Sequence, residues 1–189
     1  MKQTVPAVIF AGGKSSRMGK DKALLPFGKY NTLAEYQFHR LKTIFRQVYI
    51  SAKETKFDFA APVILDRYPT ASPLVGIVSL FESLECDAVF ILSVDAPFVK
   101  SSMIASIIEA WEGEDAVIAR SAGKVQPLCG LYAKTILPVA KQEMQKGNHK
   151  LGMLLEEVHT KYMDFSEEEA FLNLNYPEEY EKAKKLISS

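Results

Sequence analysis

The sequence has few of the residues that mark disulfide-bonded, metal-binding or membrane-spanning proteins. Its 189 residues include two cysteines, Cys86 and Cys129, and three histidines. Neither cysteine belongs to a CxxC pair or a Cys/His spacing, so we interpret both as reduced thiols rather than as a disulfide or a zinc site. No apolar stretch approaches the roughly 20 residues of a membrane-spanning helix, and the apolar run near the N-terminus is too short for a signal peptide. We therefore expect a cytoplasmic protein with no membrane partner.

An excess of charge of either sign is also missing. The 23 lysines and arginines balance the 23 aspartates and glutamates, which leaves a formal net charge of zero. Proteins that coat nucleic acid carry a broad positive face, so nucleic acid is not expected as a partner and any basic site must be local. The length and the 48% share of hydrophobic residues fit one globular domain with a substantial core.

Short apolar runs rich in β-branched residues alternate with longer amphipathic runs over the first 120 residues. The short runs predict strands over residues 4–10, 47–52, 62–66, 88–93 and 116–119. The longer runs predict helices that begin after Thr32, near Pro73 and at Ser101. Apolar strands that alternate with helices are typical of a parallel sheet covered on both faces. The sequence thus predicts the α/β class, as a single-domain three-layer α/β/α Rossmann-like fold with a mainly parallel central sheet.

The pattern is less regular after residue 123. We expect a strand in "VQPLCGLY", helices in "TILPVAKQEMQKG" and "KLGMLLEEV", and short strands in "KYMDF" and "AFLNLN". The stretch "YPEEYEKAKKLI" has a proline near its start and acidic residues in its first turn, which indicates a terminal helix. No composition break separates these segments from the first half, so we expect one domain over residues 1–189.

Three glycines and several cations follow the first expected strand in "VIFAGGKSSRMGKDKALL", residues 8–25. Glycine lets main-chain N–H groups approach an anion closely, and lysine and arginine add positive charge beside phosphate oxygens. We therefore interpret the segment as a phosphate-binding loop. It is not a Walker P-loop, since neither GxxxxGKS nor GxxxxGKT occurs, and it lacks the GxGxxG spacing of a dinucleotide fingerprint.

Carboxylates follow two further strands of the predicted sheet. Asp66 ends the third expected strand, and Asp95 follows the fourth. Ligands of parallel sheets bind beyond the carboxyl ends of the strands, so we expect the loop and both carboxylates at one edge. Each acid could instead cap a loop or a turn, an alternative that the residues alone leave open.

The glycine-rich loop resembles the signature of nucleotidyltransferases. Among them it is most similar to the MobA-type molybdenum cofactor guanylyltransferases, whose pattern is approximately LAGGxSxRMGxDKxLL, with Phe10 in place of the leucine. The stretches "VILDRYPTASPLVGIVSL", "FILSVDAPFV", "QPLCGLY" and "DFSEEEAFLNLNYPEE" resemble later family segments in the same order, so the resemblance covers nearly the whole chain. It implies a nucleotidyltransferase fold in which residues 1–120 mainly bind nucleotide and residues 121–189 mainly bind the acceptor.

The resemblance also implies a reaction and its partners. GMP would pass from GTP to the phosphate of molybdenum-molybdopterin, giving molybdopterin guanine dinucleotide cofactor and pyrophosphate, with Mg²⁺ as the cofactor. Such a transfer depends on in-line positioning and charge neutralisation more than on covalent chemistry by the protein. A monomer is expected, and transient contact with other cofactor-biosynthesis proteins or apo-molybdoenzymes stays open.

Three residues would carry the chemistry according to this resemblance. Lys22 would contact phosphate, Arg17 would stabilise charge on the leaving pyrophosphate, and Asp95 would bind Mg²⁺. Asp66 would recognise guanosine, and Ser51 stands where some relatives have asparagine. The whole implied nucleotide-binding set is Phe10, Ala11, Gly12, Gly13, Lys22, Ser51, Asp66, Gly76 and Asp95.

The acceptor side is expected in the second half of the chain. Asn173 and Asn175 alternate with leucines in the expected strand "AFLNLN", which would place both amides on one face. Gln126 and Lys150 are further acceptor candidates. A turn-forming role is the alternative for the two asparagines, because a Tyr-Pro pair follows them.

Three other functions fit parts of the sequence. A CTP-dependent molybdopterin cytidylyltransferase is the close alternative, although "AGG" in the loop and the acid before Lys22 favour GTP by resemblance. A sugar-phosphate nucleotidylyltransferase shares the loop, but the short chain and the terminal "NLNYPEE" argue against it. A non-catalytic nucleotide-binding module would have no need for a metal-binding carboxylate at Asp95.

Overall fold

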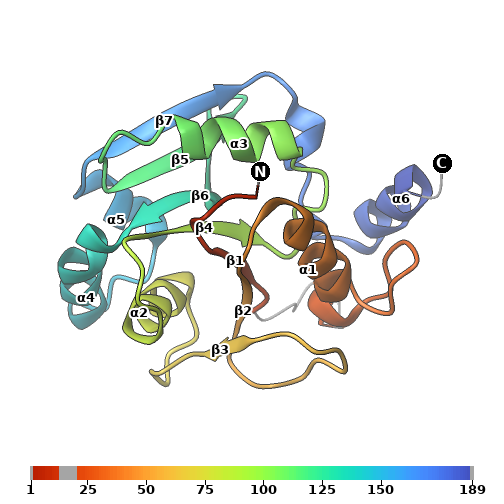
Figure 1. Cartoon of the computed structure of the whole chain (residues 1–189), viewed down its shortest axis with the longest axis horizontal. Coiled ribbons are helices and arrows are strands. Elements are labelled where there is room, and N and C mark those ends of the chain that lie inside the picture. Colours follow the sequence, from red (N-terminus) through yellow and green to blue (C-terminus); the bar gives the residue numbers. More distant parts are fainter. Residues whose placement is uncertain (1, 13–20, 188–189) are drawn as a thin grey trace.

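The computed structural model describes residues 2–12 and 21–187, which form one sheet with helices on both faces (Figure 1). The seven strands of this region have the order β3-β2-β1-β4-β6-β5-β7 across the sheet. Their bounds are β1 Ala7–Phe10, β2 Val48–Ala52, β3 Val63–Leu65, β4 Ala88–Ser93, β5 Ala116–Ser121, β6 Lys124–Ala133 and β7 Thr160–Phe165.

Six α-helices and three short 3₁₀ helices complete the described region. The α-helices are α1 Leu33–Ile44, α2 Pro73–Ser83, α3 Ser101–Glu109, α4 Leu137–Gln145, α5 Leu151–Glu156 and α6 Pro177–Ile187. The 3₁₀ helices are η1 Lys22–Leu24, η2 Lys134–Ile136 and η3 Glu168–Phe171. Within residues 2–12 and 21–187, no helix is long and apolar enough to cross a membrane.

The predicted starts of the first three α-helices are confirmed. The hydroxyl oxygen of Thr32 accepts the main-chain N–H three residues later at 3.0 Å and begins α1. Ser72 caps α2 in the same way at 3.2 Å, and Pro73 occupies the first helical position. These caps satisfy N–H groups that have no partner within the first turn. Helix α3 begins at Ser101, as the pattern predicts.

The alternation of side chains along the strands divides the core into two layers. Ile9 of β1 and Phe90 of β4 pack on one face with α1, α3 and α6. Val8 and Ile91, their neighbours along the same strands, pack on the other face with α2, α4 and α5. Figure 1 shows α2 and α4 on one side of the sheet and α1 and α6 on the other. The predicted three-layer α/β/α architecture is therefore confirmed.

Strands β3, β2, β1 and β4 pair in parallel, so their carboxyl ends meet at one edge of the sheet. Phe10, the last residue of β1, is in register with Ser51 of β2 and Ser93 of β4. The chain leaves β1 toward the glycine-rich loop at this edge, and Asp95 lies two residues beyond β4. The topology therefore gathers the predicted site residues as the parallel-sheet rule requires.

One strand runs against the others, because β6 is antiparallel to both β4 and β5. Ala122 and Gly123 join β5 to β6 with φ angles of 49° and 73°, the left-handed conformations of a two-residue hairpin turn. The predicted strand over residues 116–119 ends too early, since β5 continues to Ser121 and pairs with Lys124 across the turn. The sheet is thus mixed and mostly parallel.

The expected strand "AFLNLN" is wrong. Its first residues belong to η3, and residues 172–175 form no strand. The main-chain N–H of Leu174 donates to the carbonyl of Asp95 (3.1 Å), and that of Asn175 donates to the Glu179 carboxylate in α6 (2.7 Å). Because these bonds go to a loop and to a helix, the segment is a turn that leads into α6.

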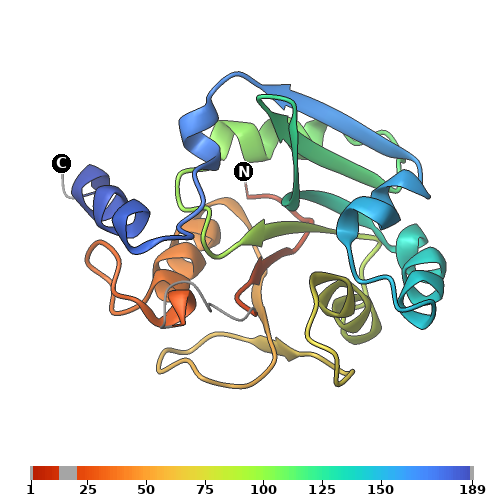
Figure 2. The ribbon, with the colours of Figure 1, turned by 180° about the vertical axis from the view of Figure 1, so that it is seen from behind.

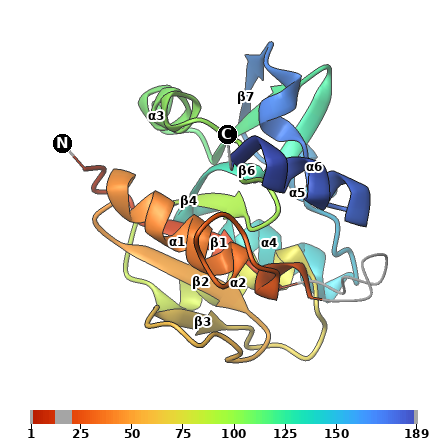
Figure 3. The ribbon, with the colours of Figure 1, turned by 90° about the vertical axis from the view of Figure 1, so that its right-hand side faces the viewer.

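The terminal helix α6 is confirmed and packs against the segment that leads into α1, as Figures 2 and 3 show. The ring of Tyr180 lies 6.5 Å from that of Phe27, centroid to centroid. Its hydroxyl donates to the carbonyl of Pro26. These contacts hold the turn over residues 172–175 close to η1 and to the carboxyl edge of the sheet.

Candidate functional site

Two cavities lie at the carboxyl edge of the sheet and share one wall. The larger has a volume of about 490 Å³ and the smaller about 170 Å³. Ser93, Asp95 and Leu128 line both of them. Asp95 therefore stands where the cavities adjoin, and a group bound in either one can approach its carboxylate.

The smaller cavity is built around the two ends of the glycine-rich loop. Its lining consists of Phe10, Ala11, Gly12, Asp21, Lys22, Ala23, Ser93, Val94, Asp95 and Leu128. Phe10 is the last residue of β1, and the next two residues follow it. Asp21 caps η1, which begins at Lys22, and the others come from the neighbouring strands β4 and β6 and the loop after β4. Of the sequence-predicted nucleotide set, the structure brings together Phe10, Ala11, Gly12, Lys22 and Asp95 here.

Lys22 joins the two halves of the chain at this point. Its Nζ lies 2.9 Å from Oδ2 of Asp95 and 2.8 Å from Oδ1 of Asn175. The side chains of Lys22 and Asp95 are 15% and 17% exposed, so the ion pair is largely shielded from water. A shielded pair is stronger than a surface pair and sensitive to the loss of either partner.

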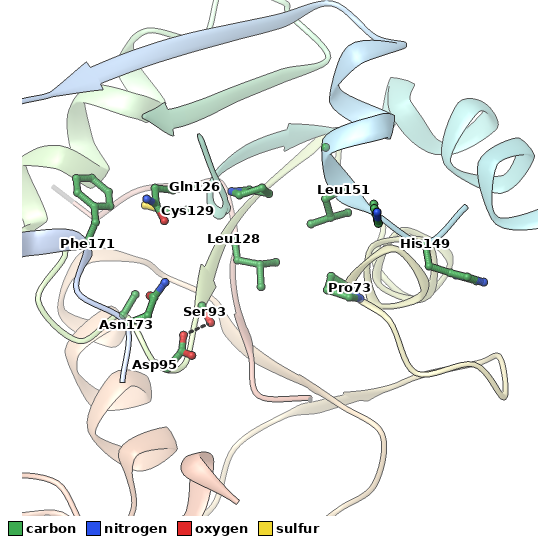
Figure 4. Close-up of a pocket in the computed structure, with 14 residues that line it drawn as sticks. Pro73, Ser93, Asp95, Gln126, Leu128, Cys129, His149, Leu151, Phe171 and Asn173 are labelled. Carbon is green, nitrogen blue, oxygen red and sulfur yellow. Dashed lines mark hydrogen bonds between the residues drawn. The ribbon is translucent and has the colours of Figure 1, made fainter. Parts of the chain in front are cut away.

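The carboxylate of Asp95 is oriented by its own loop. The hydroxyl of Ser93 donates to Oδ1 at 2.5 Å (Figure 4). The other carboxylate oxygen, Oδ2, faces Lys22. Beneath this loop, the buried amide of Gln37 in α1 donates to the carbonyls of Ser93 (3.4 Å) and Val94 (3.3 Å). Ser93 therefore orients the Asp95 carboxylate directly, and Gln37 of α1 holds the main chain of the loop that carries it.

The larger cavity lies on the other side of Asp95. Figure 4 shows Asp95 and Asn173 at one end and Pro73 and His149 at the other. Its full lining is Pro73, Ser93, Asp95, Ala96, Gln126, Pro127, Leu128, Cys129, His149, Lys150, Leu151, Gly152, Phe171 and Asn173. The predicted acceptor candidates Gln126, Lys150 and Asn173 thus share one cavity, whereas Asn175 contacts Lys22.

A contact within the protein constrains His149 in this cavity, and burial determines the chemistry of Cys129. Nδ1 of His149 lies 3.2 Å from the hydroxyl oxygen of Ser72, which joins the cavity wall to the start of α2. Cys129 is buried, and burial raises the pKa of its thiol to about 12. A thiol with that pKa stays protonated at neutral pH and does not serve as a nucleophile.

Asp66 lies at the same edge but lines neither cavity. It follows β3, which is separated from β4 by β2 and β1, and its main-chain N–H donates to the carbonyl of Ala52 (3.1 Å). Burial raises the pKa of its carboxyl group, and the charge of Lys53 partly opposes that shift. The partly desolvated carboxylate can still accept hydrogen bonds from a ligand.

Gly76 and Ser51 lie close to Phe10, the last residue of β1. A Cβ on Gly76 would stand 3.0 Å from Cε2 of Phe10 and 3.4 Å from the hydroxyl oxygen of Ser51. The glycine therefore allows α2 to pack closely on β1 and β2, which gives it a packing role. Gly13 and Arg17, the two remaining predicted residues, lie outside the described residues.

The sequence interpretation missed three polar residues near the site: Gln37, Arg40 and Lys56. Gln37 is wholly buried among apolar residues of α1, a break in the helical pattern that could have drawn attention to it. Arg40 donates to the side-chain oxygen of Gln37 (2.9 Å) and to the carbonyl of Val99. Lys56 contacts the ends of the glycine-rich loop, and no local pattern around it indicates this contact.

The sequence is similar to a known family and to several known proteins over most of its length. Residues 7–162 match the family model of the MobA-like NTP transferase domain. The chain is 38% identical over 180 residues to a molybdenum cofactor guanylyltransferase of Campylobacter jejuni, with 94% of each chain covered. It is 35% identical over 189 residues to a molybdenum cofactor guanylyltransferase of Helicobacter pylori, covering 97% of this chain and 93% of the relative.

The fold has a close counterpart among solved structures. The crystal structure of molybdopterin-guanine dinucleotide biosynthesis protein A from Archaeoglobus fulgidus matches with a TM-score of 0.83 over 97% of this chain and 99% of that chain. The sequence identity is 20%, so this likeness concerns the arrangement of helices and strands.

Proposed function

Because this chain belongs to the family of MobA-like NTP transferases, we propose that it transfers GMP from GTP to the phosphate of molybdenum-molybdopterin. Relatives named molybdenum cofactor guanylyltransferase match it over more than nine-tenths of its length. The observation that carries the proposal is the meeting of two cavities at Asp95, beside the Lys22 ammonium. A transferase needs two substrate sites that open onto one reacting centre, and the two adjoining cavities support this function.

The reaction forms and breaks one bond at the α-phosphorus of GTP. An oxygen of the acceptor phosphate attacks the α-phosphorus, and the bond from that phosphorus to the oxygen bridging toward the β-phosphorus breaks. Pyrophosphate leaves with the bonding electron pair. Because the attacking phosphate oxygen is already ionised, the step needs no general base, so the protein contributes alignment and charge.

The triphosphate would lie in the smaller cavity. Glycine at position 12 leaves the main chain open to phosphate oxygens, and Lys22 brings a cation to the wall shared with the larger cavity. Positive charge at that point would stabilise the negative charge that builds up around the α-phosphorus during transfer. Asp66, farther along the same edge, would accept hydrogen bonds from the N–H groups of guanine.

The acceptor would occupy the larger cavity. Its volume of about 490 Å³ lies within the range of small-ligand sites, roughly 300–1,000 Å³. Gln126 and Asn173 offer amides to the polar edges of a pterin, and Lys150 offers a cation to its phosphate. The acceptor phosphate would then reach Asp95 from the side opposite to GTP.

Asp95 fits a role as a Mg²⁺ ligand. Mg²⁺ is usually held by one or two carboxylates together with substrate phosphates, and it prefers oxygen ligands. Among the described residues, no group of three or more His, Cys, Asp or Glu side chains could form a protein-only metal site. Mg²⁺ held by Asp95 and the phosphates would neutralise charge between the two substrates.

Thermal unfolding in the presence of Mg²⁺ and each of GTP, CTP, ATP and UTP tests the nucleotide preference. A ligand that binds only the folded protein stabilises it by about 2.7 kcal/mol at a hundred times its Kd. We expect stabilisation by GTP above the other three. A selective effect of CTP would contradict the guanine preference and support cytidylyl transfer, and no effect of any nucleotide would contradict nucleotide binding.

A further inference from the structure

We propose that Lys56 is a positioning residue for the nucleotide, because its ammonium group connects the two ends of the glycine-rich loop. Nζ of Lys56 donates to the carbonyl of Ala11 at 3.2 Å, just after β1. The same atom forms an ion pair with the carboxylate of Asp21, just before η1. This inference rests on the proposed function, since it assigns the smaller cavity to GTP.

The lysine is held firmly in this place. Its side chain is 16% exposed and that of Asp21 is 31% exposed, so both charges are partly withdrawn from water. Nζ also lies 5.7 Å from the centroid of the Phe57 ring. Ordering a long lysine side chain costs conformational entropy, and the two oxygen contacts offset that cost.

The contact reaches Lys22 through Asp21. One carboxylate oxygen of Asp21 contacts Lys56, and the other accepts the main-chain N–H of Ala23 at 3.0 Å. Asp21 is thus the N-cap of η1, whose first residue is Lys22. Fixing the Asp21 carboxylate fixes the start of η1, and the start of η1 sets the position from which Lys22 reaches Asp95.

Charge compensation gives Lys56 a second effect on the same site. Asp21 lines the smaller cavity, so an unpaired carboxylate there would repel a triphosphate. The ammonium group of Lys56 cancels that charge. Because Asp21 and Lys22 line the smaller cavity and not the larger one, we expect both effects of Lys56 to fall mainly on nucleotide binding.

The chain contains a matched control for this contact. Nζ of Lys161 also donates to one main-chain carbonyl, that of Ala110 (2.7 Å), and forms ion pairs with Glu112 (2.9 Å) and Glu114 (3.3 Å). Lys161 lines neither cavity. Lys161→Met therefore removes the same kind of interactions as Lys56→Met at a place away from both proposed substrates.

The test compares steady-state kinetics and thermal unfolding of wild type, K56M, K56R and K161M. We expect K56M to raise KM for GTP about tenfold, equivalent to about 1.4 kcal/mol, and to leave KM for the acceptor within about twofold. K56R restores part of the loss because it keeps the charge. K161M lowers the melting temperature but leaves both KM values unchanged.

The double variant D21N/K56M isolates the charge effect. Removing the unpaired carboxylate should lower KM for GTP below that of K56M, because asparagine carries no charge to repel the triphosphate and can still cap η1. If K56M loses stability like K161M while KM for GTP stays within twofold of wild type, the positioning role is overturned.

The experiments distinguish a failure of the proposed function from a failure of the role of Lys56. Wild-type protein that binds a nucleotide without transferring it contradicts the proposed function, and the dissociation constants of wild type and K56M for that nucleotide then decide the role of Lys56. Equal dissociation constants overturn that role, and a tenfold weaker K56M supports it. Wild-type protein that binds no nucleotide overturns both proposals.

Discussion

Lys22 is the residue on which the two parts of the proposed site converge. It stands at the start of η1 and contacts the Asp95 carboxylate and the Asn175 amide, which follow β4 and precede α6. The three residues are far apart in the sequence, and only the folded chain brings them together. A cation held in this manner costs little reorganisation when phosphate charge develops beside it.

Replacing Lys22 by methionine tests this role. We expect Lys22→Met to lower kcat by about 10²- to 10³-fold, the usual effect of removing one group that stabilises transition-state charge. Steady-state rates of pyrophosphate release measure the change. Lys29→Met is a suitable control, since Lys29 is exposed and lines neither cavity. Equal activity of the two variants would contradict the role of Lys22.

Asp66 gives a prediction that depends on pH. Burial raises the pKa of its carboxyl group, so the native state binds this proton more tightly than the unfolded chain does. The free energy of unfolding therefore falls as pH rises from the unfolded pKa through the folded pKa. Asparagine does not ionise, so we expect Asp66→Asn to have a higher free energy of unfolding than wild type at pH 7. The difference in unfolding free energy between the two proteins should become smaller toward pH 4.

The same substitution should impair nucleotide binding. Loss of the hydrogen bonds that guanine N–H groups would donate to the charged carboxylate should weaken GTP binding by roughly ten- to a hundredfold. Melting temperatures between pH 4 and pH 8 measure the change in stability, and GTP titrations measure the change in affinity. Asp58→Asn, at an exposed position between β2 and β3, is the control and should change neither. If Asp66→Asn is less stable at every pH, the carboxylate is a structural cap instead.

The hairpin between β5 and β6 carries strain at one residue. Within the described part of the chain, Ala122 is the only residue other than glycine with a positive φ, 49°. The left-handed conformation costs an ordinary side chain roughly 1–2 kcal/mol, and asparagine tolerates it better. Asn-Gly is also the preferred pair for a turn with two positive φ angles.

We expect Ala122→Asn to stabilise the protein by about 1 kcal/mol. Chemical denaturation measures the free energy of unfolding, and activity should stay at the wild-type level because Ala122 is exposed and lines neither cavity. A loss of stability in this variant would contradict the account of the turn.

The elements near the start of the chain follow from local patterns, which is why they could be predicted. Apolar runs predict β1 to β4 and α1 to α3 from their own sequence, and the capping residues Thr32 and Ser72 add start signals for α1 and α2. The direction of β6 could not be predicted, because alanine at position 122 is not a turn signal. The "AFLNLN" stretch has the alternation of a strand, but its hydrogen bonds go to the Asp95 loop and α6, so no neighbouring strand pairs with it.

Some residues of the candidate site could also be predicted from the sequence, and others could not. The glycine-rich loop, Lys22 and Asp95 could be found from motifs and from their places after strands. The contact of Asn175 with Lys22 could not be placed correctly, since the expected strand does not form. Gln37 and Lys56 act on loops that are distant in sequence, so their partners depend on which elements become neighbours in the fold.

The sheet of the folded protein places two cavities side by side. The smaller cavity is lined mainly by residues 10–12, 21–23 and 93–95, and the larger mainly by residues 126–129 and 149–152 together with Phe171 and Asn173. This distribution supports the proposed division into a nucleotide half, residues 1–120, and an acceptor half, residues 121–189. Asp95 from the first half and Leu128 from the second line both cavities and form the wall between them.

The most direct test of the account follows the α-phosphate itself. Purified protein is incubated with Mg²⁺, molybdenum-molybdopterin and GTP labelled at the α-phosphorus, and the products are separated. The account predicts label in a pterin dinucleotide and one pyrophosphate per transfer, with both lost in Asp95→Asn. Label that remains in GTP, or that appears only as free GMP, would contradict the proposed guanylyl transfer.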